Sequence, residues 1–206
     1  MKKRLILLTL LLVLTGSGAL ARSPFVRFGV EWGPSAVLYS STHLFYTDRD
    51  GITVREDDSG FNSHINGFVL GHVGVNATDF LSFSVHSGYA GVGKDNRLIP
   101  VLLRVTAAPD GFDADGLFFF IDGGTGFHLT HNDQPDIDPA FMADAGMGYH
   151  FSLAPSVRLE FALNLKLTCD QILIPDPDRG GYIPAENINK NSAKYLALCL
   201  SVGFSF

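Results

Sequence analysis

The last twelve residues of the chain constrain its fold more than any other segment. Large apolar side chains occupy every second position from Leu196 to Phe206, which is the period of a β-strand whose two faces meet different surroundings. The other face carries small groups such as Ala197, Ser201 and Gly203, where a water-facing strand would expose Lys, Glu or Thr. Because a narrow barrel lumen needs small groups and lipid accepts apolar ones, the segment predicts a membrane-spanning strand.

Seven earlier segments alternate in a similar way. In 157–168, six large apolar residues share one face, and Arg158, Glu160 and Lys166 lie on the other. The remaining segments are 141–152, 117–129, 97–106, 81–89, 63–76 and 26–38. The last two are less regular, because Val37, Phe68 and Leu70 fall on the polar parity. Eight such segments predict an all-β fold, an eight-stranded antiparallel up-and-down transmembrane β-barrel.

The connections between these segments alternate in length. Segments 76–79, 108–115 and 153–156 are mostly tight turns rich in Asn, Asp, Pro and Gly. The alternate connections, 40–62, 91–96, 130–138 and 171–194, are mostly longer. Short turns of outer-membrane barrels face the periplasm and long loops face outside. We therefore expect both chain ends to lie at the periplasmic end.

The N-terminus has the features of a secretory signal. Lys2, Lys3 and Arg4 precede a short apolar run, and Ala19-Leu20-Ala21 supplies a cleavage site, so residues 1–21 are expected to be removed. The chain has 15 basic and 21 acidic residues and the signal contains three of the bases, which leaves 12 minus 21, a net charge of −9, on residues 22–206. This acidic balance argues against a nucleic-acid partner.

Two groups of residues resemble a known family. The chain ends on Leu200, Val202, Phe204 and Phe206, a final alternating strand closed by an aromatic residue. Ile99-Pro100-Val101-Leu102-Leu103-Arg104 is followed by a Gly-rich segment, 120–127. Both resemble the small outer-membrane β-barrel family, in particular the Bacteroidetes-type β-barrel domain and the OmpA/OmpX-like barrels. The resemblance implies a barrel domain over 22–206 in the bacterial outer membrane, surrounded by lipid and lipopolysaccharide. It also implies that the barrel-assembly machinery recognises the C-terminal residues during insertion.

The polar parity contains a balanced set of charges, which are the candidate site residues. They are Arg27, Glu31, Arg104, Asp122, Asp144, Arg158, Glu160 and Lys166. Four acids and four bases in one narrow interior are costly unless they pair. One interpretation is a network of salt bridges that fills the lumen. The other is a polar pore or proton path, which needs the charges to be separated.

Other residues carry weaker signals. His72, His86, His128 and His150 share the polar parity, but their spacing does not indicate a metal site or require a cofactor. Cys169 and Cys199 lie on neighbouring strands with opposite parity, which argues against a disulfide. The first and third long loops are acidic, with Asp48, Asp50, Glu56, Asp57, Asp58, Asp133, Asp136 and Asp138. This composition suits either a solvated surface or one that binds cations or a partner.

The sequence contains no catalytic motif, since the adjacent pairs Ser63-His64 and His86-Ser87 point to opposite faces of their strands. We therefore expect a non-enzymatic outer-membrane barrel with a plugged, salt-bridged lumen and a structural or surface-interaction role. The alternatives are a small channel or transport barrel, and a secreted soluble β-barrel that binds an apolar ligand.

Overall fold

The computed structural model describes residues 26–206 except 49, 94–95, 130–136, 155–156 and 177–179. The proposed signal, residues 1–21, lies outside the described residues. No helix within the described ranges has the length and apolar character needed to cross a membrane.

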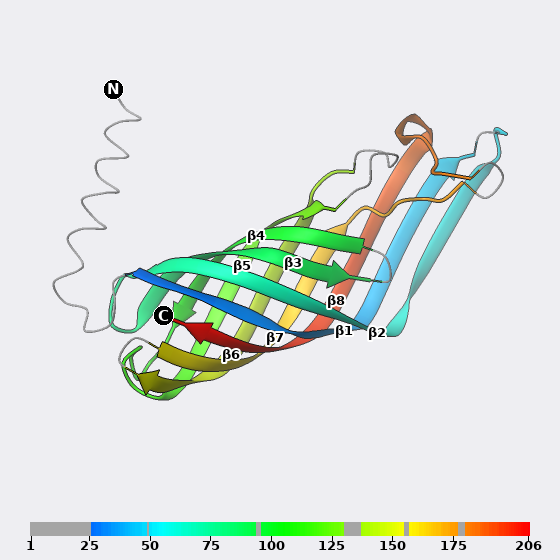
Figure 1. Cartoon of the computed structure of the whole chain (residues 1–206). Helices are drawn as coiled ribbons and strands as arrows, with labels where there is room; N and C mark the ends of the chain where they lie inside the picture. Colours follow the sequence, from blue (N-terminus) through cyan, green and yellow to red (C-terminus); the bar gives the residue numbers. More distant parts are fainter. Residues whose placement is uncertain (1–25, 49, 94–95, 130–136, 155–156, 177–179) are drawn as a thin grey trace, which may run out of the picture.

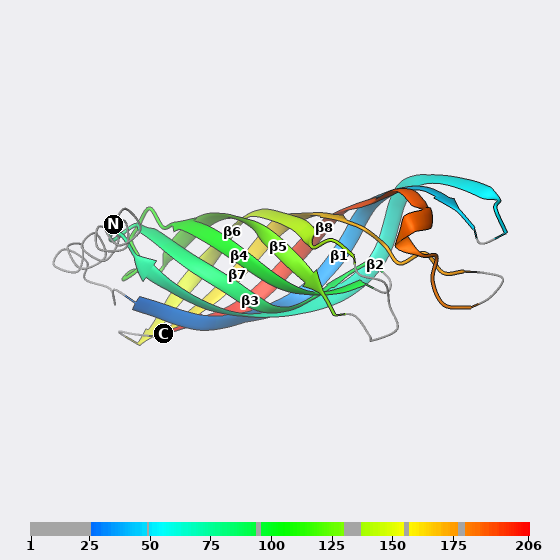
Figure 2. The same ribbon diagram turned by 90° about the horizontal axis from the view of Figure 1, so that it is seen from above.

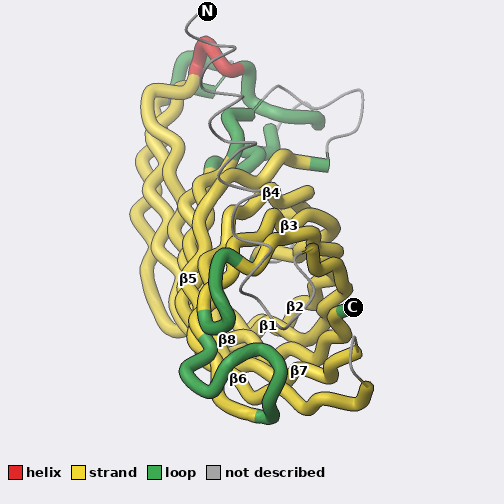
Figure 3. The backbone as a smooth tube through the Cα atoms, turned by 90° about the vertical axis from the view of Figure 1, so that its left-hand side faces the viewer, coloured by secondary structure: helices red, strands yellow, loops and turns green. Residues whose placement is uncertain are grey.

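The described residues form one closed sheet. Its strands are β1 (Val26–Thr47), β2 (Thr53–Asn76), β3 (Leu81–Val92), β4 (Asn96–Ala107), β5 (Gly116–His128), β6 (Ala140–Ala154), β7 (Val157–Asp170) and β8 (Ile188–Ser205). Each strand pairs antiparallel with the next, and β1 pairs with β8 to close the ring (Figures 1 and 3). A short 3-10 helix, η2 (Ala185–Asn187), precedes β8. The predicted fold class is confirmed.

Within the barrel wall, side chains alternate between the exterior and the lumen along the strands. On β8, Leu196 and Leu200 are exposed, while Ala197, Cys199 and Ser201 are buried. The same alternation places large apolar side chains outside on all the other strands. An exterior of this kind is suited to lipid, because closure of the ring pairs the backbone of each strand with both of its neighbours along the barrel wall.

The first and last long loops are shorter than the sequence predicts. The prediction of a loop over 40–62 was wrong, because β1 and β2 continue as a paired hairpin to Thr47 and Thr53. The prediction of a loop to Lys194 was also wrong, since β8 begins at Ile188 and pairs with the extended β1. Both extensions are polar and lack the apolar alternation that predicts a membrane strand. Strands that leave the membrane no longer need an apolar face. Figure 2 shows the hairpin projecting beyond β3 and β4.

A β-bulge and a proline modify the ladder. The pairing of β1 shifts by one residue at Leu38. Odd-numbered residues such as Val37 face the lumen before this bulge, and even-numbered residues such as Leu44 are the buried ones after it. Pairing of β1 with β8 is interrupted at Gly33-Pro34, because proline has no N–H to donate. There the strands approach so closely that a Cβ on Gly33 would lie 1.8 Å from the carbonyl oxygen of Leu200. Glycine is required at this position for that approach.

Candidate functional site: the barrel lumen

The most ordered polar site is a central ion network around Arg104 of β4. Its guanidinium donates to both carboxylate oxygens of Glu31, at 2.9 and 3.0 Å, and its Nε donates to Asp122 at 2.8 Å. Glu31 comes from β1, on the opposite side of the ring from β4 and β5, so these bonds cross the lumen. The Arg104 guanidinium also lies 4.1 Å from the centre of the Phe120 ring. One guanidinium therefore donates hydrogen bonds to two buried carboxylates in the forked geometry that arginine provides.

A second group lies beside this network, on β6 and β7. The Lys166 amine is 3.7 Å from Asp144, and the Asn164 amide donates to the other oxygen of that carboxylate at 3.1 Å. Asp144 is the direct register partner of Asp122, which brings the two groups side by side. The Lys166 amine also lies 4.8 Å from the centre of the Phe68 ring. The buried charges of the lumen are thus clustered with opposite signs in contact.

A third group occupies the end of the lumen near the chain termini. Arg27 donates to Glu160 at 2.8 Å and to Ser205 at 3.0 Å, and Ser205 donates to Glu160 at 2.6 Å. Arg158 is buried nearby and has a longer contact, 3.8 Å, with Asp113 of the β4–β5 turn. All eight predicted charged residues therefore project into the interior, where the structure arranges them as three local groups.

The β4–β5 turn places a buried aromatic side chain, Phe112, in the end of the lumen, and the sequence does not predict it. We call this residue the stopper. Phe112, in the middle of the turn, is 2% exposed and packs with Ala108, Phe118 and Phe120. Its ring centre lies 4.7 Å from the Arg27 guanidinium. Gly111 adopts a φ of 86°, which lets the chain turn so that the next residue points inward. The only sequence signal was an aromatic residue in an otherwise polar turn.

Two apolar clusters fill the lumen on the other side of the ion network. One contains Val37, Phe68, Leu70, Ala90, Ala197 and Cys199; the other contains Val92, Leu98, Leu102, Ala140 and Met142. Tyr195 packs against both clusters. The residues that disturbed the alternation of the first two segments, Val37, Phe68 and Leu70, therefore face inward and form a core. The charged residues are only part of what fills the interior.

Little free space remains between these layers. A cavity of about 30 Å³ lies between the central network and the third group. Its lining includes Arg27, His86, Arg104, Phe112 and Glu160. That volume exceeds the ~10–15 Å³ that a cavity needs to hold one water molecule. The interior can therefore hold a water molecule there, but not a solute of metabolite size.

The four lumen histidines lie in different surroundings. His72 and His86 stack with ring centres 4.7 Å apart, and His86 Nδ1 lies 3.3 Å from Glu31. His128 contacts Asp170 at 2.8 Å near the loop end of the barrel, and His150 contacts the carbonyl oxygen of Ala114 at 2.6 Å. Only His72 and His86 come together, and each ring is already packed against the other.

The cysteines are free and lie far apart along β7 and β8. Cys199 is buried and pairs in register with Asn164, five residues from Cys169. Its thiol donates to Ser35 Oγ at 3.3 Å. The register therefore holds the two thiols apart.

The C-terminal residues lie on the lipid-facing exterior near the terminal end of the barrel. Phe206 stacks on Phe28 with ring centres 5.5 Å apart, and the Phe204 and Trp32 rings are 6.1 Å apart. The backbones of Phe28 and Phe206 exchange two hydrogen bonds of 3.1 and 2.7 Å. The final strand and the first strand thus close the ring together.

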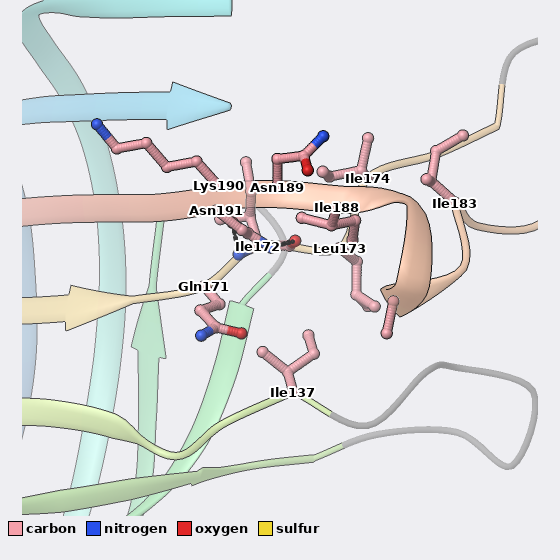
Figure 4. A pocket seen from close by; sticks show the side chains of 11 residues that line it. Ile137, Gln171, Ile172, Leu173, Ile174, Ile183, Ile188, Asn189, Lys190 and Asn191 are labelled. Carbon is pink, nitrogen blue, oxygen red and sulfur yellow. Dashed lines mark hydrogen bonds between the residues drawn. The ribbon is translucent and has the colours of Figure 1, made fainter. Parts of the chain in front are cut away.

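The opposite end of the barrel carries a small structured cap. The segment after β7 packs Ile174 and Ile183 against Leu44 and Tyr46 of the β1–β2 hairpin. A pocket of about 230 Å³ lies beside this cluster, lined mainly by aliphatic side chains, with the Lys190 side chain at one side (Figure 4). The cap orders the base of the hairpin outside the barrel wall. Asp133 and Asp136 of the third loop lie outside the described residues.

The exposed hairpin contains a hydrogen-bonded charge cluster. His43 Nδ1 lies 2.7 Å from Asp57, and Arg55 Nε donates to the other oxygen of that carboxylate at 3.0 Å. The hydrogen bond with His43, and after it the one with Arg55, lowers the pKa of Asp57 below its ordinary value.

We expect His43→Ala to raise the pKa of Asp57 toward the ordinary value, because the first of these bonds is lost. The carboxyl titration in carbon-detected NMR spectra measures this change. A folded-state pKa below the unfolded value stabilises the hairpin above the unfolded pKa, and this contribution is lost as the pH falls through the folded value. Arg55→Gln is the companion variant and should give a smaller rise. An unchanged Asp57 titration in His43→Ala would contradict the assignment.

Comparisons with known proteins found matches among solved structures but none among protein families or curated sequences. Among solved structures, the chain is similar to the outer membrane protein OprG from Pseudomonas aeruginosa, with 13% identity, a TM-score of 0.49, and 90% of this chain and 99% of that chain covered. It is also similar to Neisserial surface protein A, with 12% identity, a TM-score of 0.48 and coverage of 86% and 95%. The outer membrane protein AlkL has 12% identity, a TM-score of 0.46 and coverage of 89% and 92%.

The architecture itself determines the location. A closed antiparallel barrel with an even number of strands, an apolar exterior and a polar interior is the form in which β-sheets span bacterial outer membranes. The protein is an integral β-barrel protein of the bacterial outer membrane.

Proposed function

We propose that the protein is a closed, non-enzymatic barrel that acts through its outer surface and not through its lumen. The observation that carries the proposal is the filled interior, in which three groups of paired charges and two apolar clusters occupy the lumen and a cavity of about 30 Å³ lies beside the Arg104 network. The network of Arg104, Glu31 and Asp122 crosses the lumen, and the apolar clusters lie between that network and the loops. A small barrel needs such a filling, because eight strands enclose only enough room for side chains.

Neither alternative has comparable support. A channel needs separated charges and a continuous water path, whereas the charges are in contact and apolar side chains block the path. A soluble barrel for an apolar ligand needs an apolar cavity inside and a polar exterior, and the exterior of this barrel is apolar. The proposed partners are therefore outer-membrane lipid and lipopolysaccharide around the wall, the barrel-assembly machinery during insertion, and a surface partner at the hairpin end.

Electrical recording in planar lipid bilayers tests the closed lumen. We expect the purified, refolded protein to give no stable conductance steps above the background of the bare bilayer. A porin inserted in the same bilayer serves as the positive control, and a shift in gel mobility on heating verifies that the protein under test is folded. Reproducible conductance steps from the folded protein would overturn the proposal.

A further inference from the structure

We propose that the outer edge of β2, residues 53–67, binds an extended Lys/Arg-rich segment of a partner protein as an added β-strand. The inference rests on the proposed function, because it names the partner chemistry of the surface that the closed barrel presents. It depends on three features of the hairpin: a free backbone edge, an excess of carboxylates and an exposed aromatic side chain.

The first feature is a stretch of β2 that has a paired strand on one edge and none on the other within the described residues. β3 pairs with β2 only from Phe68 to Asn76, while β1 covers the other edge of β2 along its whole length. Within the part of the chain that the structure describes, no strand pairs with 53–67 on the β3 side. Figures 1 and 2 show this part of β2 extending past the barrel rim. An uncovered edge of this length presents a row of N–H and C=O groups to any extended chain.

The hairpin turn fixes which backbone N–H and C=O groups of β2 point away from β1. Asp48 N–H donates to the carbonyl oxygen of Ile52 at 2.9 Å, so these two residues form a hydrogen-bonded pair. Hydrogen-bonded and non-hydrogen-bonded pairs alternate along an antiparallel ladder. In the observed register Gly60 therefore bonds to Ser40 of β1, whereas Ser59 directs its N–H and C=O away from β1. Asp57 and Arg55 likewise direct their backbone N–H and C=O away from β1. Every second residue of this edge therefore offers a donor and an acceptor to an added strand.

The second feature is charge. Residues 53–67 contain Glu56, Asp57 and Asp58 against a single cation, Arg55, which already donates to Asp57. All four side chains are exposed. Cationic side chains on an added strand would lie opposite or diagonal to these carboxylates, at distances where opposite charges attract. A second copy of this chain would instead bring two acidic edges together, and like charges in that position destabilise the pairing.

The third feature is an apolar anchor on the same stretch. Phe61 is 95% exposed and Ile65 is 72% exposed, and the Phe61 ring contacts Tyr39 edge-on with centres 6.1 Å apart. Exposed aromatic side chains often anchor interfaces, since their burial releases a large area from water. The expected partner segment therefore places basic residues across from 56–58 and an apolar residue across from Phe61.

Fluorescence anisotropy with the barrel in nanodiscs of zwitterionic lipid tests the proposal. The probe is a fluorescein-labelled peptide of alternating Lys and Val, and the matched control peptide has Glu in place of Lys. We expect saturable binding of the Lys peptide that weakens as salt rises, and no binding of the Glu peptide. Ser59→Pro removes an edge N–H without removing a β1 ladder bond, and we expect it to weaken binding about tenfold or more, because the proline ring also obstructs the added strand. Ser59→Ala keeps the N–H and should bind like the unaltered protein.

A double variant and amide exchange complete the test. Glu56→Gln with Asp58→Asn should weaken binding and flatten its salt dependence. In the unaltered protein the peptide should slow hydrogen exchange at Ser59 and leave Gly60 unchanged, a readout that holds even if Ser59→Pro does not fold. Equal affinity for both peptides, unchanged binding in a folded Ser59→Pro variant, or peptide-independent dimers in sedimentation would each overturn the proposal. Conductance of the barrel would overturn the proposed function without affecting these binding results.

Discussion

Replacing Arg104 with alanine should destabilise the folded barrel by about 3–5 kcal/mol, because it leaves two buried carboxylates without their cation. Glu31 accepts two of its hydrogen bonds and Asp122 accepts a third. Both carboxylates are buried in the lumen and cannot recover the lost interactions from bulk water. Urea unfolding in phospholipid vesicles measures the change, with Trp32, the only tryptophan, as the fluorescent reporter on the exterior.

Two further variants separate lost charge pairing from lost packing. Arg104→Lys retains the positive charge but loses the planar guanidinium. A single ammonium group cannot make the same hydrogen bonds to Glu31 and Asp122, so this variant should have intermediate stability. Combining Arg104→Ala with Glu31→Gln and Asp122→Asn should recover part of the loss, because the uncompensated charges are removed. If the single Arg104→Ala variant were as stable as the unaltered protein, the network would not hold the lumen together.

Replacing Phe112 with alanine should cost about 3–5 kcal/mol, the range observed when a buried phenylalanine is truncated. The ring is almost fully buried, packs with Phe118 and its apolar neighbours, and lies 4.7 Å from the Arg27 guanidinium. Its removal leaves a cavity at the mouth of the barrel nearest the chain ends. The same urea experiment measures the loss of stability.

Phe112→Leu is the matched control for this position. Leucine keeps most of the apolar volume but has no ring face for Arg27, so the smaller loss should reflect packing differences and a cation–π contribution of about 0.5–2 kcal/mol. Wild-type stability of Phe112→Ala would show that the β4–β5 turn is not a structural stopper. Since the central network and the apolar clusters remain in place, we expect both variants to stay non-conducting.

The barrel itself follows from the sequence because its main determinant is local. Every second residue of a strand faces the same side, and lipid on one side requires an apolar residue at each of those positions. Leu196 to Phe206 meet this requirement without exception, so the strand and its orientation can be read directly. The same logic predicts that Arg104, Asp122 and Glu31 lie inside the ring, where the structure has them.

The hairpin extension could not be read in this way. Beyond the membrane a strand faces water on both sides, so residues such as 53–62 lose the apolar periodicity and resemble a loop. Their strand conformation comes from pairing with β1, which in turn is held by β8. The bulge at Leu38 further reverses the parity midway along β1, which no simple period of two anticipates.

The strand number, the apolar exterior and the charged residues of the interior can be predicted from the sequence, since each depends on alternation within one strand. Tertiary contacts set which charges meet, turn Phe112 inward, and bring Val37, Phe68 and Leu70 together in an apolar layer. Those outcomes depend on register between strands and on the path of a turn. Both bring together residues far apart in the chain, and no local pattern records their distances.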